Sequence, residues 1–179
     1  VRSVNYFISR ACNYSCKFCF HTQKNTNHIS LEQAKIGLKM LRQAGTEKIN
    51  FTGGEPFLNP ILLGELCRSS HELGLAVSII SNGSLITRRW METYGEFVDI
   101  LGISVDSFHP ETNAAIGWGG DTDNNHVDRV LAARELCAQH AIKFKMNTVV
   151  CSFNGQEDMS KHVRMLYPER WKAFQVLIL

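Results

Sequence analysis

Apolar and polar positions follow two alternating periods along the chain, one typical of strands and one typical of helices. Residues 31–43 place apolar side chains at helical spacing, and Ser30 with Gln33 forms a candidate capping box ahead of them. Gly45 follows as a helix stop, and the β-rich segment 48–52 comes next. This strand-then-helix rhythm repeats to the end of the chain.

The same pattern predicts the remaining elements. We expect strands over 4–8, 48–52, 76–81, 98–106, 143–150 and 171–179, and helices over 31–43, 61–73, 88–94, 127–140 and 159–166. Strands that alternate with helices imply a parallel sheet, hence either a doubly wound sheet or a (βα) barrel. A long stretch without a predicted element, 107–125, follows the fourth strand. In both architectures ligands bind at that end of the strands.

The composition is that of one globular domain, which we expect to span 1–179. Of 179 residues, 44% are hydrophobic and 20% charged, so the chain can bury a core without a structural metal. The net charge is +2 and the basic residues are scattered, which argues against a nucleic-acid partner. No apolar run is long enough to cross a bilayer. Because the chain starts at Val1 without a methionine and ends on an apolar run, we expect the domain to be truncated at both ends.

Cysteine usage favours a reducing, cytoplasmic setting. The chain has six cysteines, and Cys12, Cys16 and Cys19 lie within eight residues. A disulfide framework would instead spread paired cysteines over a smaller, loop-rich chain. Three thiolates on one short loop can bind three irons of a cubane cluster and leave the fourth iron open. The alternative is a structural zinc ion with His21 as the fourth ligand, although structural zinc sites usually join two separate ligand pairs.

Further polar residues follow the next three predicted strands. In the segment 53–56 (Gly-Gly-Glu-Pro), two glycines permit close backbone approach and Glu55 offers an acceptor for an ammonium group, although an ordinary turn explains the segment equally well. The segment 81–83 (Ser-Asn-Gly) ends the third strand, and Ser104 and Asp106 share one face at the end of the fourth. Polar groups on a buried parallel strand need partners, which a bound ligand can supply.

In this order, after a C-x3-C-x2-C loop, these motifs resemble the radical S-adenosylmethionine (SAM) superfamily. The resemblance implies a partial (βα)6 barrel of the TIM type with parallel strands, and a [4Fe-4S] cluster held by Cys12, Cys16 and Cys19. It also implies that SAM chelates the fourth iron. The residues that the resemblance assigns to SAM are Phe18, Thr52, Gly53, Gly54, Glu55, Ser81, Asn82, Ser104 and Asp106.

Segments outside these motifs resemble the viperin-like enzymes, an antiviral branch of the superfamily, over nearly the whole chain. They are 12–22, 43–45, 47–51, 53–58, 81–86, 106–108, 125–127, 170–172 and 174–175. The resemblance implies that SAM cleavage yields a 5′-deoxyadenosyl radical, which abstracts the C4′ hydrogen of a ribonucleoside triphosphate, CTP or UTP. Loss of the 3′-hydroxyl as water then gives the 3′-deoxy-3′,4′-didehydro nucleotide.

Basic side chains on three predicted strands independently favour a phosphorylated substrate. Lys145 shares a face with Asn147, Arg170 shares one with Lys172, and Lys48 lies on the second strand. Buried strand faces rarely accept unpaired cations, and a polyphosphate would supply the counter-charge. Protein carboxylates or water are the alternative partners. The resemblance to viperin-like enzymes assigns triphosphate contacts to Lys48, Lys145, Asn147, Arg170, Lys172 and Asn5.

The chain departs from the viperin-like pattern at two places. Trp118 stands where these enzymes carry an arginine expected to meet the SAM carboxylate, and an indole can stack on a ring but cannot pair with a carboxylate. The tyrosine that these enzymes use as a hydrogen-atom donor would fall beyond the end of this chain. No catalytic hydrogen donor is therefore assigned.

Two alternative functions remain open at the level of the sequence. One is a radical SAM enzyme with a peptide or other non-nucleotide substrate, and the other is a non-catalytic module stabilised by zinc. For the nucleotide-modifying enzyme, the resemblance implies a reductant or electron-transfer protein as a partner. We expect a monomer, with membrane association only through an N-terminal segment outside this chain.

Overall fold

The computed structural model describes residues 1–20, 29–118 and 125–176. Six strands form one sheet: β1 (Ser3–Ser9), β2 (Lys48–Gly53), β3 (Ala76–Ser81), β4 (Ile100–Ser104), β5 (Lys143–Val150) and β6 (Arg170–Gln175). The α-helices between them are α1 (Leu31–Gln43), α2 (Pro60–Glu72), α3 (Arg88–Tyr94), α4 (Pro110–Ile116), α5 (His126–Gln139) and α6 (Ser160–Leu166). Two short 3-10 helices, η1 (Pro56–Leu58) and η2 (Gly95–Phe97), complete the described part.

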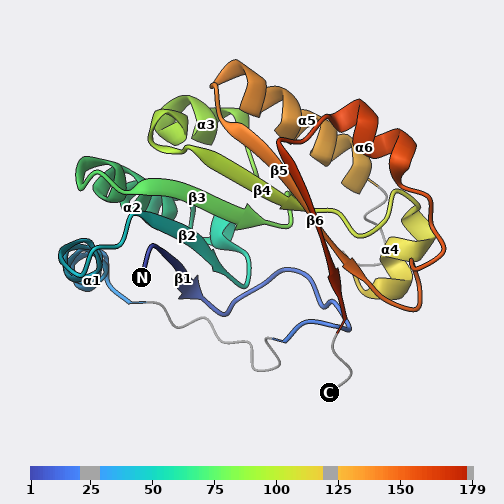
Figure 1. Cartoon of the computed structure of the whole chain (residues 1–179), viewed down its shortest axis with the longest axis horizontal. Helices are drawn as coiled ribbons and strands as arrows, with labels where there is room; N and C mark the ends of the chain where they lie inside the picture. Colours follow the sequence, from blue (N-terminus) through green and yellow to red (C-terminus); the bar gives the residue numbers. More distant parts are fainter. Residues whose placement is uncertain (21–28, 119–124, 177–179) are drawn as a thin grey trace.

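The strands pair in chain order from β1 to β6, and every pair is parallel. A doubly wound sheet would reverse its strand order at a switch point, and this sheet does not. Right-handed crossovers without a reversal place the helices on one side of the sheet (Figure 1). Among the described residues β6 does not pair with β1, so the sheet stays open. This architecture confirms the predicted partial (βα)6 barrel.

The core lies between the sheet and its helices. Along β2, Ile49 and Phe51 are fully buried while their neighbours are half-buried, the period-two pattern of a strand with two different faces. Leu38 from α1 and Leu63 from α2 pack in the same core. We refer to the helix-covered side as the outer face and to the opposite side as the inner face. The inner face carries the polar and basic strand residues.

The observed elements differ from the expected ones mainly in the region after β4. The sequence pattern predicts no element over 107–125, yet α4 forms there, with Pro110 in its first turn and Gly117 in the left-handed conformation at its end. A helix this short shows little periodicity. β4 is also shorter than the predicted 98–106 by two residues at each end, and Asp106, beyond its end, bonds to the β5 backbone through its side chain.

The other boundaries agree within two residues wherever they are described. The last strand was predicted over 171–179, of which 177–179 lie outside the described residues.

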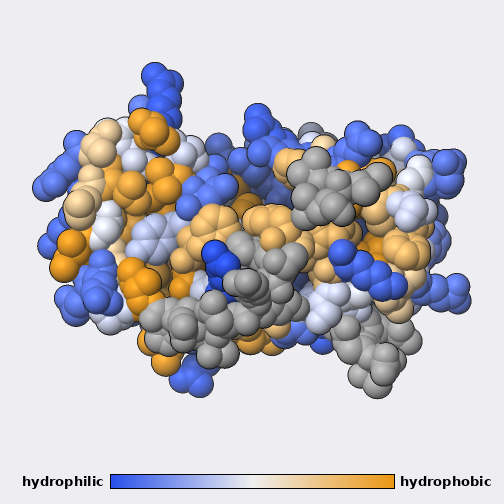
Figure 2. All heavy atoms as spheres, turned by 90° about the horizontal axis from the view of Figure 1, so that it is seen from below, coloured by the Kyte–Doolittle hydropathy of each residue, from blue (hydrophilic) through white to orange (hydrophobic). Residues whose placement is uncertain are grey.

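No helix in the described part is long and apolar enough to span a membrane. On the face seen from below, hydrophobic residues gather over much of the surface and hydrophilic residues project around its rim (Figure 2).

Candidate active site

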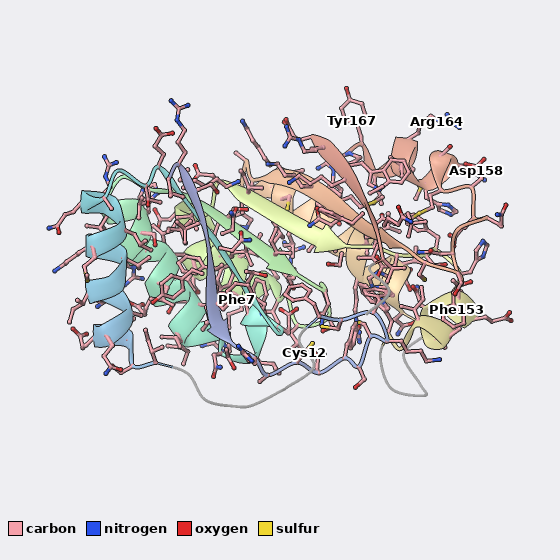
Figure 3. All side chains as sticks on the ribbon, turned by 60° about the horizontal axis from the view of Figure 1, so that its bottom comes forward. Phe7, Cys12, Phe153, Asp158, Arg164 and Tyr167 are labelled. Carbon is pink, nitrogen blue, oxygen red and sulfur yellow. The ribbon has the colours of Figure 1, made fainter. Side chains whose placement is uncertain are left out.

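The cysteine loop, defined as residues 12–19, leaves the carboxyl end of β1 and runs along the edge of the sheet toward α4 (Figure 1, Figure 3). Cys12, Cys16 and Cys19 are half-buried, and none forms a disulfide. The Tyr14 N–H donates to Cys12 Sγ at 3.4 Å, and the Cys19 N–H donates to the Cys16 carbonyl at 3.1 Å. The three thiols therefore belong to one short, internally bonded turn.

The three thiols lie close enough to interact electrostatically. Burial, followed by the charges of Asp106, Cys12 and Cys19, raises the pKa of the Cys16 thiol to about 12. A bound metal would reverse this shift, because it binds the thiolate.

No three His, Cys, Asp or Glu side chains within the described ranges are spaced to share one metal ion. His21, the predicted fourth zinc ligand, lies outside those ranges. The thiolates of a cubane cluster each bind a different iron, so they are not required to converge on a single ion. Three neighbouring thiols with one backbone N–H donated to sulfur fit such a cluster chemically.

The two glycines at the end of β2, Gly53 and Gly54, hold the start of the cysteine loop. The Gly54 N–H donates to the Ser9 carbonyl at 2.9 Å, and the Glu55 N–H donates to the Ala11 carbonyl at 2.8 Å. A Cβ on Gly54 would overlap the Ala11 carbonyl, and one on Gly53 would overlap the Ser9 carbonyl. The close backbone approach predicted from the two glycines is therefore an approach to the backbone of Ser9 and Ala11, within the same chain.

Glu55 is buried and bonded on both carboxylate oxygens. Its Oε1 accepts from Ser81 Oγ at 2.8 Å and from the Phe57 N–H at 3.0 Å, and its Oε2 accepts from the Asn82 N–H at 2.8 Å. Only 2% of the residue is exposed, and burial raises the pKa of the carboxyl group. Glu55 therefore joins the turns after β2 and β3. Its contact with a SAM ammonium group stays a prediction.

Asn82 links the end of β3 to the cysteine loop. Its Nδ2 donates to Asn13 Oδ1 at 3.0 Å and lies 4.0 Å from Cys12 Sγ. Asn13 in turn donates to Ser84 Oγ at 2.8 Å. The second and third motifs predicted from the sequence therefore meet the first one at the carboxyl edge of the sheet.

Asp106 and Trp118 form a buried hydrogen-bonded pair that the sequence pattern does not predict. The Trp118 Nε1–H donates to Asp106 Oδ2 at 2.8 Å, so this indole does bond to a carboxylate, although not to that of a ligand. Asp106 Oδ1 accepts from the Val149 N–H at 2.7 Å. Burial raises the pKa of Asp106 to about 6. The indole supplies one neutral N–H, which suffices for a hydrogen bond where an ion pair is impossible.

The remaining predicted SAM residues lie on the loop and on the inner face. Phe18 is half-buried and packs against the small apolar cluster around Trp118. Thr52 is half-buried beside Phe7 in the β1–β2 register, and Ser104 lies beside Asn147 in the β4–β5 register.

Four basic side chains from three strands gather on the inner face, and we call them the cation face: Lys48, Lys145, Arg170 and Lys172. Lys145 pairs in register with Arg170, and Asn147 pairs with Lys172. Lys48 comes from the other half of the sheet, yet desolvation together with the charges of Lys172 and Arg170 lowers its pKa. The pKa of Lys145 is lowered by desolvation and by the neighbouring cations. The four charges therefore repel one another across the open sheet.

No ion pair within the described part of the chain neutralises the cation face. Asn5 lies at the margin of this surface, where Asn50 Nδ2 donates to Asn5 Oδ1 at 3.1 Å. The predicted substrate residues thus share one side of the sheet, whereas the cysteine loop lies at its carboxyl edge.

Sequence reasoning missed the residues that support the cysteine loop. Tyr14 is 4% exposed and packs with Ile116 and Trp118 in an apolar cluster, against which Cys151 also packs. An aromatic residue inside a cysteine loop was the one available signal. Two of its partners come from the last residue of α4 and the segment just after it, and the sequence pattern did not predict α4.

Several solved structures share this fold. The Streptococcus suis SuiB structure bound to precursor peptide SuiA matches with a TM-score of 0.80 at 17% identity, covering 98% of this chain and 39% of that one. The anSMEcpe structure with bound AdoMet also gives 0.80, at 21% identity over 98% of this chain and 52% of that one. At these identities the likeness shows the fold alone.

Curated relatives match at higher identity. The S-adenosylmethionine-dependent nucleotide dehydratase RSAD2 of Oncorhynchus mykiss is 46% identical over 99% of this chain and 52% of its own length. A protein named S-adenosylmethionine-dependent nucleotide dehydratase from a Thermoplasmatales archaeon is 35% identical, over 99% of this chain and 63% of its length. The chain spans about half the length of the first of these relatives. The model of the Radical SAM superfamily matches residues 6–166. The chain therefore belongs to the radical SAM superfamily.

Proposed function

We propose that the chain is the core of a radical SAM nucleotide dehydratase acting on a ribonucleoside triphosphate, CTP or UTP. The substrate loses its C4′ hydrogen and then its 3′-hydroxyl as water, giving the 3′-deoxy-3′,4′-didehydro nucleotide of a viperin-like antiviral enzyme. The names of the curated relatives support the reaction class. The cation face supports a polyphosphate substrate and is the single observation that carries the proposal.

The cysteine loop would hold the cofactors. Membership of the superfamily implies a [4Fe-4S] cluster and SAM. When bound, they supply a radical able to remove hydrogen from an unactivated carbon. Cys12, Cys16 and Cys19 would bind three irons. The residues proposed around SAM are Phe18, Thr52, Gly53, Gly54, Glu55, Ser81, Asn82, Ser104 and Asp106.

The cation face would hold the triphosphate. Four basic groups crowd one side of an open sheet, where desolvation and then neighbouring cations lower the pKa of Lys48 and of Lys145. None of the four forms an ion pair with a carboxylate among the described residues. A bound triphosphate would turn this repulsion into attraction, since arginine and lysine form charge-assisted hydrogen bonds with phosphate. Asn147 and Asn5 would add neutral donors. Fixing the triphosphate would orient the ribose toward the carboxyl edge.

Nucleotide binding by substituted proteins tests this proposal. We expect Lys145→Ala and Lys172→Ala each to weaken CTP or UTP binding about tenfold or more, because each removes a charge-assisted bond. Lys39→Ala is the matched control, since Lys39 is an exposed lysine of α1, on the outer side. Isothermal titration would measure the affinities, and SAM cleavage without nucleotide would report on the cofactor end separately.

Two results would contradict the proposal. Unchanged CTP and UTP affinity in both variants would remove the triphosphate from the cation face and favour a non-nucleotide substrate. A protein that takes up one zinc and no iron after anaerobic preparation would favour the non-catalytic module. The reductant partner, the monomeric state and the cytoplasmic location stay predictions.

A further inference from the structure

We propose that Trp118 and Asp106 are positioning residues that clamp the cysteine loop onto the end of α4. This inference rests on the proposed function only for its purpose, which is to hold three thiols ready for a cluster. The clamp itself is a property of the chain. It can therefore be tested on protein that carries no metal.

The first part of the clamp is the buried indole of Trp118. Its Nε1–H donates to Asp106 Oδ2 at 2.8 Å, and Asp106 is anchored in turn by the Val149 N–H at 2.7 Å. The Asp106 carbonyl accepts from Asn154 Nδ2 at 2.7 Å, so the carboxylate stands on a backbone fixed by the segment after β5. This chain of bonds sets the position and plane of the indole.

The second part of the clamp is the aromatic contact with the loop. The rings of Trp118 and Tyr14 lie 5.3 Å apart at 57°, within the range of favourable aromatic pairs. Trp118 also contacts His126 of α5, with ring centroids 4.3 Å apart. Tyr14 lies between Cys12 and Cys16, and both cysteines pack against this cluster. An indole that contacts both His126 of α5 and Tyr14 therefore fixes the middle of the loop.

The third part of the clamp is a backbone seam. The Ser15 N–H donates to the Gly117 carbonyl at 3.2 Å, and the Lys17 N–H donates to the Ile116 carbonyl at 2.9 Å. A Cβ on Gly117 would lie 2.5 Å from the Ser15 carbonyl, and its φ of 98° is also one that favours glycine. The loop thus uses carbonyl groups that a helix end leaves unpaired. Trp118 directly follows Gly117, so its indole side chain lies next to these backbone hydrogen bonds.

Hydrogen exchange on metal-free protein tests the clamp. Trp118→Phe keeps an aromatic ring and removes the N–H, so the Ser15 and Lys17 amides should exchange about tenfold faster. Trp90→Phe is the matched control, because Trp90 is also 6% exposed and its Nε1–H also donates at 2.8 Å, to the Pro60 carbonyl. That variant should leave both loop amides at their original rates.

A second variant and a second readout guard against general unfolding. In Asp106→Asn the side chain keeps one oxygen, whereas the carboxylate accepts from two donors, the Trp118 Nε1–H and the Val149 N–H. Hydrogen exchange at the same two loop amides should therefore become faster. After anaerobic reconstitution, Trp118→Phe should lose its iron to a chelator about tenfold faster than Trp90→Phe and alter the paramagnetic resonance of the reduced cluster. Nucleotide affinity should stay unchanged, because the cation face is not touched.

The outcomes are distinguishable. Equal exchange of the two amides in Trp118→Phe and Trp90→Phe would overturn the clamp, and so would full protection in Asp106→Asn. Failure of the original protein to assemble any cluster would overturn the proposed function, while the exchange rates would still decide whether the clamp exists.

Discussion

The carboxyl edge of the sheet and its inner face are polar regions built in opposite ways. At the edge, Glu55 accepts three hydrogen bonds and Asp106 accepts bonds on both carboxylate oxygens. On the inner face, the charges that act on Lys145 are all cations, and Asp99 is the one carboxylate among the charges that act on Lys48. The two buried carboxylates of the edge already have hydrogen-bond donors within the chain. The inner face instead has an excess of positive charge that a ligand would offset.

This difference indicates which region carries stability and which carries affinity. Bonds between buried groups hold the cysteine loop in place before any cofactor binds, which limits the ordering cost of binding. Crowded cations weaken the folded state slightly and favour an anion. Substitutions at the edge should therefore cost stability, and substitutions on the cation face should cost binding. The predictions below test this division, beginning with the largest expected effect.

Gly54→Ala should have the largest effect of the substitutions at the edge. The added Cβ would overlap the carbonyl group of Ala11. This group belongs to the backbone, so it cannot move aside by a rotamer change as a side chain can. We expect a loss of about 3 kcal/mol or more in the free energy of unfolding, together with loss of cluster assembly. Urea unfolding and iron content would measure both effects.

Gly37→Ala provides the matched control for that substitution. Gly37 lies inside α1, and the nearest atom to an added Cβ is Tyr6 Oη at 3.6 Å, an ordinary contact. We expect a gain of about 0.5–1 kcal/mol, because alanine restricts the unfolded chain more than glycine does. Equal stability of the two variants would mean that the approach at Gly54 is not tight.

Glu55→Gln should have an intermediate effect, even without a cofactor. An amide nitrogen cannot accept a hydrogen bond, so at least one of the Ser81, Phe57 and Asn82 donors would lose its partner. We expect a cost of about 1–2 kcal/mol in urea unfolding of metal-free protein, reduced by removal of a buried charge.

Glu32→Gln is the control for this charge change. Glu32 is 82% exposed in an ion pair with Lys35, so its loss should change stability by less than about 0.5 kcal/mol. Unchanged stability of Glu55→Gln, combined with weaker SAM binding, would assign Glu55 to the ligand alone and contradict the structural role argued for the edge.

The sequence pattern predicted the strands, the helices between them and the place of the cysteine loop, but not what supports the loop. Periodicity locates long amphipathic segments such as α1, and parallel strands bring their carboxyl ends to one edge. α4 has seven residues and too few turns to show a pattern. The bond between Trp118 and Asp106 joins residues twelve positions apart across that helix. Local patterns carry no information about such a pairing.

The sequence also predicted which basic residues lie on the inner strand faces, but not the electrostatic interactions between them. From the sequence alone, alternation groups Lys145 with Asn147 on β5 and Arg170 with Lys172 on β6. The register that brings the two groups side by side comes from the structure. The approach of Lys48 from β2 depends on the curvature of the open sheet, which no local pattern records. The roles of these residues toward a nucleotide stay predictions.

Among the test substitutions, as distinct from their controls, Lys145→Gln should give the smallest effect on stability, and its sign is the sharpest test of the comparison. Desolvation and neighbouring cations lower the pKa of Lys145 from 10.5, so the folded state disfavours the charged lysine. The resulting cost is present below the lowered pKa and disappears as the pH rises past the unfolded value. At neutral pH and low salt, Lys145→Gln should therefore raise the free energy of unfolding by about 0.5 kcal/mol.

Salt and nucleotide should each change the stability gain of Lys145→Gln, and for different reasons. Salt should shrink the gain, because it screens repulsion between partly exposed charges. A saturating triphosphate should reverse the order of stability, since a ligand stabilises most the protein that binds it best. Lys39→Gln, away from the cation face, should show neither behaviour. If Lys145→Gln instead destabilises the ligand-free protein at low salt, an attractive partner must hold Lys145, and the inner face would be complete in itself like the edge.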